Sequence, residues 1–171
     1  MTHRIAIAAA AVTGAGVIAL SALWHPVPLL VWNVSASVPV GLYALRLPER
    51  LTVDDLVIVR PPEPLAGMLA DGRYLPRGVS LIKHIGALPG QTVCRQGDAV
   101  SVDGTVRAYA RHHDHGGRLL PVWNGCRNVG QGEVFLLNAR EPASLDSRYF
   151  GPLPSTAVIG RAVPLWVEGE R

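Results

Sequence analysis

Val79–Gly90 reads VSLIKHIGALPG and contains the only lysine of the chain, which otherwise carries its positive side-chain charge on arginine. Side chains alternate between the two faces of a strand. If this stretch is a strand, Lys83 lies on its apolar face, together with Val79, Leu81 and Ile85. Burying an ammonium group there is costly, and the usual result is a lowered pKa and a neutral amine, which arginine cannot provide. Lys83 is thus a candidate general base; a lysine that snorkels to the surface or pairs with a carboxylate is the alternative.

The chain beyond Gly41 has the pattern of a mainly β protein. Its 18 Gly and 14 Pro suit short strands and turns better than a helical bundle. We predict a hairpin over Ala99–Ala108 around Asp103-Gly104, and one short helix between Pro64 and Ala70. Three further strands are predicted at Leu56–Arg60, Val134–Leu137 and Ala157–Trp166.

Size and charge limit the classes of protein to consider. A chain of 171 residues, 49% of them hydrophobic, suffices for one globular domain with a core. The net charge is +3 and the pI is near 9.2, but the arginines are scattered and form no basic cluster. We therefore expect no nucleic-acid partner.

A histidine-rich stretch, Ala110–Gly117, is predicted to be a surface loop. It contains His112, His113, Asp114 and His115. Adjacent positions in such a loop do not converge on one ion without further ligands, and no HExxH or paired CxxC accompanies them. We expect a solvated polar loop, with no metal and no cofactor.

The N-terminal segment has the length and composition of a membrane span. Ile5–Leu23 is an uncharged, mostly apolar run after Arg4. At about 1.5 Å per residue it just crosses a hydrocarbon core about 30 Å thick. A removed signal peptide, with a weak cleavage site at Ala19–Ser21, is the alternative. The run is longer than a usual signal core and apolar sequence continues in Pro26–Trp32, so we favour an uncleaved anchor in a lipid bilayer.

These features divide the chain into an anchor or signal sequence, residues 1–25, and a mainly β domain, residues 26–171. Arg4 precedes the span, and the next arginine is Arg46. The positive-inside rule therefore places the β domain outside the cytoplasm.

Cys94 and Cys126 are the only cysteines. In the oxidising compartment that this topology implies, such a pair favours a disulfide. Closing that loop stabilises the fold by about 3 to 4 kcal/mol in the chain-entropy model. Two buried free thiols are the alternative if the domain is not exported.

A base needs a nucleophile, and Asn33–Tyr43, NVSASVPVGLY, offers one. Ser37 comes before Pro39 and Gly41, a rigid and then a permissive backbone that can hold a hydroxyl in an exposed turn. Ser35 lies on the same side of an extended chain. A serine paired with a lysine is a known variant of the hydrolytic triad. Taken alone, this stretch is better explained as a polar turn just outside the membrane.

A third stretch, Pro142–Pro154, reads PASLDSRYFGPLP and is dense in hydroxyl groups. Asp146 and Arg148 lie on one side of it if it is extended, and can pair. The Ser144 hydroxyl can donate to or accept from an amine. Taken alone, this stretch is only a loop.

Together, the three stretches resemble the signal peptidase family of membrane-anchored serine proteases with a Ser-Lys dyad. The order matches: an anchor, a serine before a proline, a lysine six residues before Pro89-Gly90, and a Ser-x-Asp-Ser-Arg segment at Ser144–Arg148. Five shorter motifs are similar to those of the conjugative transfer branch of the family, the TraF type. They are SVPVGLY, GRYLPRG, NGC, GEVFLL and RYFGPLP. Ser-Val-Pro is one residue shorter than the Ser-Met-x-Pro of general signal peptidases, which also favours this branch. The resemblance extends from the anchor to Trp166.

This resemblance implies a role for each candidate residue. Ser37 would be the nucleophile and Lys83 the general base. The Ser37 backbone N–H, with the Ser35 hydroxyl, would form the oxyanion hole, and Ser144 would orient the amine. The acid and the arginine of the third stretch would brace the segment that carries Ser144.

The implied fold is a signal-peptidase-like antiparallel β catalytic domain behind one N-terminal transmembrane helix, with the domain in the periplasm and the anchor in a bacterial inner membrane. The implied substrate is a membrane-delivered pre-protein, for which we expect a prepilin of a conjugative transfer (type IV secretion) system. The acyl-enzyme would be hydrolysed, or captured by the pilin's own amino terminus to close a circle; both outcomes stay open.

Two other functions remain as alternatives. A housekeeping type I signal peptidase usually carries a larger second β domain, for which the span between Lys83 and Ser144 leaves little room. A non-enzymatic membrane-anchored β-domain of a secretion assembly would explain the fold but not the solitary buried lysine.

Overall fold

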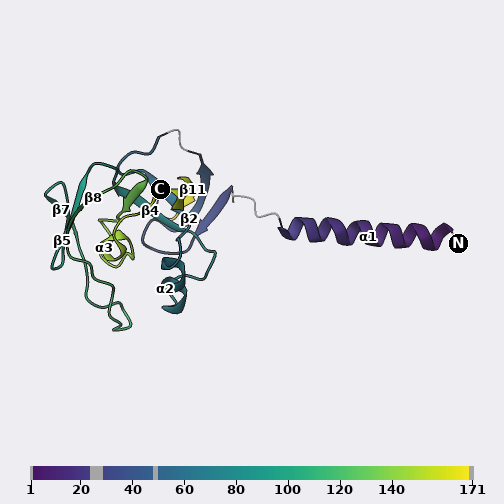
Figure 1. Ribbon diagram of the computed structural model, residues 1–171, viewed down its shortest axis with the longest axis horizontal. Helices are drawn as coiled ribbons and strands as arrows, with labels where there is room; N and C mark the ends of the chain where they lie inside the picture. Colours follow the sequence, from purple (N-terminus) through teal and green to yellow (C-terminus); the bar gives the residue numbers. More distant parts are fainter. Residues whose placement is uncertain (1, 24–28, 48–49, 170–171) are drawn as a thin grey trace.

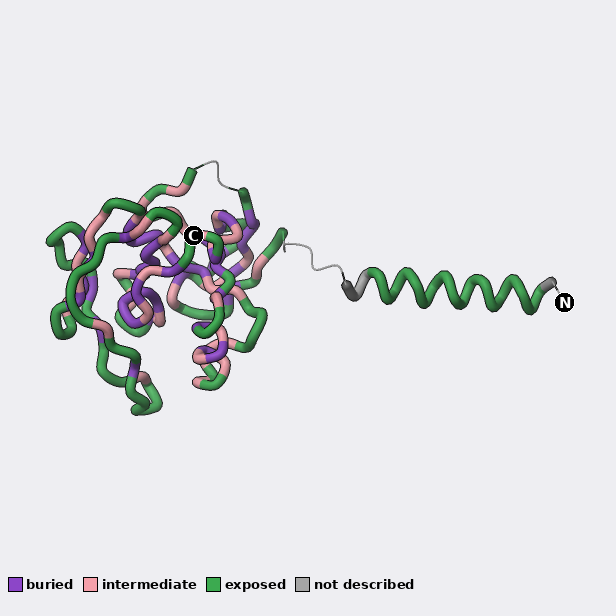
Figure 2. Tube along the Cα trace, in the orientation of Figure 1, coloured by how far each residue is buried: buried purple, intermediate pink, exposed green. Residues whose placement is uncertain are grey.

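The computed structural model describes residues 2–23, 29–47 and 50–169. Helix α1 (Thr2–Leu23) extends away from a β-rich body that contains the other elements (Figure 1). Its segment His3–Leu20 has a mean hydropathy of 1.6 and is 0% buried (Figure 2), so α1 is long and apolar enough to cross a membrane. The predicted boundary between residues 25 and 26 lies outside the described residues.

Seven strands form the larger sheet of the body, and each pairing in it is antiparallel. In order across the sheet they are β1 (Leu30–Asn33), β2 (Gly41–Arg46), β11 (Val158–Val167), β3 (Leu56–Val59), β4 (Leu81–Ala87), β9 (Glu133–Leu136) and β10 (Leu153–Pro154). The strands predicted from the sequence are confirmed as β3, β9 and β11, with each end within one residue. The mainly antiparallel β fold that we predicted is thus the observed one.

Four short strands form a second sheet, in the order β7 (Thr105–Tyr109), β6 (Ala99–Val102), β5 (Thr92–Gln96) and β8 (Gly125–Asn128). The hairpin predicted over Ala99–Ala108 is confirmed as β6 and β7. The span between Lys83 and Ser144, which we expected to leave little room for the larger second β domain of a housekeeping signal peptidase, holds this small sheet. Strands of four or five residues are short enough to fit there.

Two local features hold the second sheet together. At the β6–β7 turn, Asp103 and Gly104 have φ angles of +48° and +79°, as tight two-residue hairpin turns require. On the adjoining strands, Cys94 of β5 pairs with Cys126 of β8, and a disulfide joins them. The edge strand β8 is therefore tied covalently to its neighbour.

Among the described residues, two short helices accompany the strands, α2 (Leu65–Asp71) and α3 (Ser147–Phe150), with one 3-10 turn at Ser155–Ala157. The helix predicted between Pro64 and Ala70 is confirmed as α2, one residue further along. The extended conformation expected of this segment holds for Asp146 itself, whose φ and ψ are −152° and −165°, but the residues that follow it form α3. Asp146 is the N-cap of α3, and its carboxylate accepts from the backbone N–H of Arg148.

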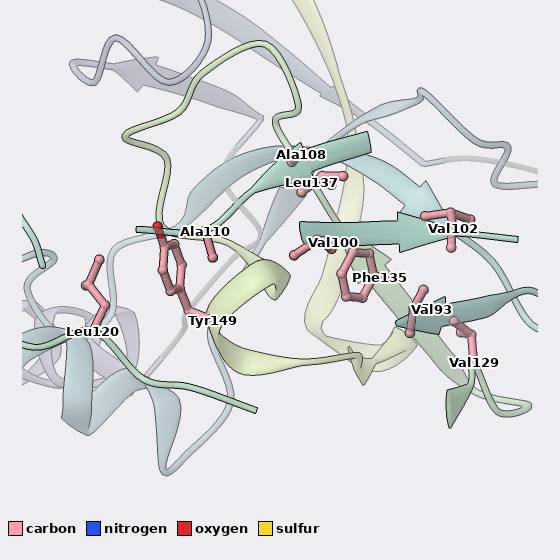
Figure 3. Packing of buried hydrophobic residues seen from close by; sticks show 11 residues of the cluster. Val93, Val100, Val102, Ala108, Ala110, Leu120, Val129, Phe135, Leu137 and Tyr149 are labelled. Atoms are coloured by element: carbon pink, nitrogen blue, oxygen red, sulfur yellow. The ribbon is translucent and has the colours of Figure 1, made fainter. Parts of the chain in front are cut away.

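A core between the second sheet, β9 and α3 positions the segments that carry the candidate site. Val93 and Val100 of the second sheet pack with Phe135 of β9 and Tyr149 of α3 (Figure 3). Full burial of a side chain such as Phe135 stabilises the fold by about 1.5 to 3 kcal/mol. This packing fixes α3 and the end of β9 against each other.

The loop predicted at Ala110–Gly117 lies at the surface, and its three histidines are exposed. Asp114 differs from the solvated residue that we expected: it is half-buried and accepts hydrogen bonds from the Tyr74 hydroxyl at 2.6 Å and from Arg118 Nε at 2.7 Å. Asp114 therefore organises the loop. Within residues 2–23, 29–47 and 50–169, no group of three His, Cys, Asp or Glu side chains could hold a metal ion.

Candidate active site

Lys83 lies in β4 and is only 4% exposed. Its Nζ donates to Ser144 Oγ at 2.8 Å and to Ser37 Oγ at 3.2 Å. The buried face of β4 also includes Ile85, but Val79 lies before the strand and is 44% exposed, so its expected place beside Lys83 is wrong. No ion pair within the described part of the chain includes Lys83. The amine therefore sits between two hydroxyl groups.

Burial lowers the pKa of Lys83 from 10.5 to about 8. Removal of the amine from water is the main cause, because it disfavours the ammonium form. The Asp146 carboxylate opposes this effect, the Arg148 guanidinium adds to it, and Glu141 opposes it. The balance leaves an amine that is half deprotonated at about pH 8, which is within the range suited to a general base.

Ser37 lies in the loop that connects β1 to β2, and it is half-buried. Its Oγ is 3.1 Å from Ser35 Oγ, and Ser35 Oγ also donates to Asn33 Oδ1 at 3.2 Å. The structure thus brings together the two serines of this loop and the lysine of β4, which are separated by 46 residues or more. A hydroxyl beside a buried amine has the geometry of nucleophilic catalysis.

Ser144, Asp146 and Arg148 are each no more than 2% exposed. Arg148 binds the Asp146 carboxylate with two hydrogen bonds, Nε to Oδ1 at 2.8 Å and Nη2 to Oδ2 at 3.0 Å. Nη2 of Arg148 also donates to the backbone carbonyls of Asn138 at 2.8 Å and Glu141 at 3.1 Å. These bonds tie together the two ends of the segment from Asn138 to Asp146, which carries Ser144.

Three buried polar residues near the site were missed by sequence reasoning. Asn33 is 8% exposed and Asn138 is 3% exposed, and both contact the loop that carries Ser37. Arg95 of β5 is 1% exposed and donates through Nη1 to the Arg148 carbonyl at 2.9 Å. The signal for Asn33 was its place two residues before Ser35, where asparagine often bonds to nearby backbone. No local pattern marks the other two.

Comparison with known proteins finds relatives over most of the chain. A family model described as "Signal peptidase, peptidase S26" matches residues 2–167. The chain is 33% identical over 145 residues to a conjugal transfer protein TraF of Agrobacterium fabrum, covering 78% of this chain and 80% of the relative. It is also 33% identical over 164 residues to a probable conjugal transfer protein TraF of Sinorhizobium fredii, covering 90% and 84%. A signal peptidase I from Enterococcus faecalis matches with a TM-score of 0.40 and 20% identity, covering 66% of this chain and 97% of that chain.

Proposed function

We propose that this chain, which belongs to the signal peptidase family, peptidase S26, is a membrane-anchored serine endopeptidase in which Ser37 and Lys83 form the catalytic dyad. One observation carries the proposal: the buried amine of Lys83 lies within hydrogen-bonding distance of the Ser37 hydroxyl. The relatives named as conjugal transfer proteins support a prepilin of a conjugative transfer system as the substrate.

In the first half of the reaction, Ser37 Oγ attacks the carbonyl carbon of the scissile peptide bond. The neutral amine of Lys83 takes the hydroxyl proton and then gives it to the leaving amine, so that an ester on Ser37 remains. A pKa of about 8 leaves about one Lys83 amine in ten neutral at pH 7 and half at pH 8. The base is therefore available without any further change in the protein.

In the second half, a nucleophile attacks the ester carbonyl, and Lys83 takes its proton and returns it to Ser37 Oγ as the ester bond breaks. Water as the nucleophile releases the fragment N-terminal to the cut as a carboxylate, whereas the amino terminus of that same fragment closes a circle. Ser144 holds the amine in place through both halves, because Lys83 Nζ lies closer to Ser144 Oγ, at 2.8 Å, than to Ser37 Oγ, at 3.2 Å. Asp146 and Arg148 brace the segment that carries Ser144.

The oxyanion of each tetrahedral intermediate needs hydrogen-bond donors. In this proposal the Ser37 backbone N–H supplies one, and the Ser35 hydroxyl, which donates to Asn33 Oδ1 in this structure, supplies the second by rotating its proton toward the oxyanion. The distance of 3.1 Å between the two hydroxyl oxygens supports the second donor, because the oxyanion forms next to Ser37 Oγ. Loss of one such donor typically lowers kcat by about 10²- to 10³-fold.

The enzyme acts at the membrane, with its body in the periplasm and α1 in the inner membrane. Arg4 at the start of α1 supports this orientation through the positive-inside rule. Exposed apolar side chains on β1, the first described strand after α1, and on β11 support contact with lipid. Trp32 of β1 and Trp166 of β11 are 55% and 56% exposed, and their rings stack with centroids 5.6 Å apart.

The test is cleavage of a prepilin by the full-length protein in detergent. Ser37→Ala and Lys83→Arg should each abolish processing, because arginine has no neutral form to accept the serine proton. The double variant should be no worse than either single one, since residues that act as a unit give non-additive losses. Ser101→Ala, in β6 of the second sheet, is the matched control and should keep wild-type activity.

Circular dichroism must first show that each variant is folded. Substantial cleavage by folded Lys83→Arg would refute the dyad. A second substrate, a general exported pre-protein, separates the two peptidase functions: equal processing of both substrates favours a housekeeping signal peptidase over a transfer enzyme.

A further inference from the structure

The loop that carries Ser37 lacks regular backbone pairing, yet the proposed reaction needs its hydroxyl held firmly. Asn33 and Gly41 are the last paired residues of β1 and β2, so residues 34–40 lie outside the ladder. Catalytic groups must be held within about 0.5 Å of their productive positions. The described contacts identify two buried asparagines, Asn33 and Asn138, that bind this loop and are 105 residues apart in the sequence.

Asn33 binds the loop from within. Its Nδ2 donates to the backbone carbonyls of Ser35 at 2.8 Å, Val38 at 3.1 Å and Pro39 at 3.0 Å. Its Oδ1 accepts from the backbone N–H and the hydroxyl of Ser35, both at 3.2 Å. One carboxamide thus supplies both the donors and the acceptor that the loop lacks, which neither an aspartate nor an aliphatic residue can do.

Asn138 binds the loop from across the site. Its Nδ2 donates to the Ser37 carbonyl at 2.9 Å, and its Oδ1 accepts from the backbone N–H of His84 at 3.0 Å. A backbone N–H only donates and a carbonyl only accepts, so these two partners determine which end of the carboxamide is which. The imidazole Nδ1 of His84, 3.1 Å from the same oxygen, is therefore the donor in that contact.

His84 is the residue after Lys83 in β4, so the bond from the His84 backbone N–H to Asn138 Oδ1 also holds the strand at the lysine. One carboxamide connects the backbone of the nucleophile, Ser37, to the backbone of the residue beside the base. Asn138 is itself held at both backbone groups, since its N–H donates to Asp146 Oδ2 at 3.0 Å and its carbonyl accepts from Arg148 Nη2 at 2.8 Å. The Asn138 side chain therefore cannot shift without disturbing the Asp146–Arg148 pair that holds the segment carrying Ser144.

We propose that Asn33 and Asn138 are positioning residues for the peptidase reaction, which together set the Ser37 hydroxyl against the Lys83 amine. The inference rests on the proposed function and adds two residues to it. In the described residues the Lys83 amine hydrogen-bonds to Ser37 and Ser144 and to neither asparagine, so the asparagines act through the backbone of residues 34–40, the nucleophile loop. A misplacement of about 1 Å can lower the rate by about 100-fold.

The experiment measures prepilin cleavage and hydrogen exchange of the full chain in detergent, for Asn33→Ala, Asn138→Ala and the control Asn128→Ala. Asn128 is exposed on β8 and accepts from Thr92 Oγ1, away from the site. We expect kcat to fall by about 10- to 100-fold in both test variants, with KM within about twofold and the apparent base pKa of the pH profile unchanged. Amides of residues 34–40 should exchange at least about tenfold faster, and the control should match the wild type.

Asn138→Asp is a second variant in case Asn138→Ala fails to fold. The aspartate keeps the shape of the asparagine side chain and the oxygen that accepts from His84, but its carboxylate cannot donate to the Ser37 carbonyl. It should lose activity at each pH tested. Wild-type kcat in folded variants, or an equal loss in Asn128→Ala, overturns the positioning role. A loss of activity without faster exchange in the loop overturns it as well. If Ser37→Ala cleaves as fast as the wild type, the proposed function fails instead, whatever the asparagine variants show.

Discussion

The burial of Lys83 should make the stability of the protein depend on pH through this one side chain. Its pKa falls from 10.5, the value expected of the unfolded chain, to about 8 in the folded protein. Between these values the unfolded chain binds more protons than the folded one, so the free energy of unfolding rises with pH in this window. Below pH 8 the folded protein holds a buried ammonium, which costs about 3 kcal/mol, because one pKa unit corresponds to about 1.4 kcal/mol.

Lys83→Met isolates this contribution, because methionine has a similar length and no titratable group. The variant leaves the hydroxyls of Ser37 and Ser144 without the amine, but that cost does not change with pH. The quantity to compare is the free energy of unfolding of the variant minus that of the wild type. We expect this difference to be constant below pH 8. Between pH 8 and 10.5 it should decrease by about 3 kcal/mol, because the wild type gains stability there and the variant does not.

Thermal or guanidinium unfolding of both full-length proteins in detergent, followed by circular dichroism, measures the difference. Its change corresponds to about 6 to 12 °C in Tm for a domain of this size. Tyrosines and the terminal amine titrate in both proteins and cancel. A difference that stays constant from pH 7 to 10.5 would show that Lys83 has an ordinary pKa, and would remove the physical reason for a neutral base.

Three further predictions concern other parts of the molecule. Ser144→Ala should lower kcat by about one to three decades in a folded protein, a loss of about 1.4 to 4 kcal/mol of transition-state stabilisation; an unchanged rate removes Ser144 from the site. The purified protein should show no free thiol until reduced, and replacing both Cys94 and Cys126 by serine should lower the free energy of unfolding by about 3 to 4 kcal/mol, measured by denaturant titration; thiol labelling of the unreduced, denatured protein contradicts the bridge. A reporter that is active only outside the cytoplasm should be active when fused after Arg171, whereas activity of a cytoplasm-only reporter there would reverse the topology.

Sequence reasoning worked best where the signal is local. Lys83 stands out because it is a solitary ammonium in an apolar strand, and the Asp103-Gly104 hairpin follows from the turn chemistry of those two residues. The three stretches of the candidate site could be combined only through the resemblance to a family, because each stretch alone has an ordinary structural explanation.

The features that were missed depend on contacts between distant residues or on elements too short to show a period. Asn138 is 101 residues from Ser37, and nothing near it in sequence marks it as the partner of a particular carbonyl. Helix α3 has four residues, about one turn, so it has no hydrophobic periodicity to distinguish it from an extended segment. The segment around Asp146 was therefore expected to be an extended loop, although Asp146 caps a helix.

The position of β11 in the larger sheet has a consequence for the order in which the candidate site assembles. β11 comes after every other strand of the described residues, yet it pairs with β2 on one side and with β3 on the other. The hairpin whose loop carries Ser37 and the strand pair that carries Lys83 are therefore joined by a strand that is synthesised after both. Ser37 and Lys83 leave the ribosome well before β11 does, so a chain translated only as far as β10 contains both residues without the strand that joins their two parts of the sheet. The candidate site thus cannot assemble through this sheet until β11 has been made.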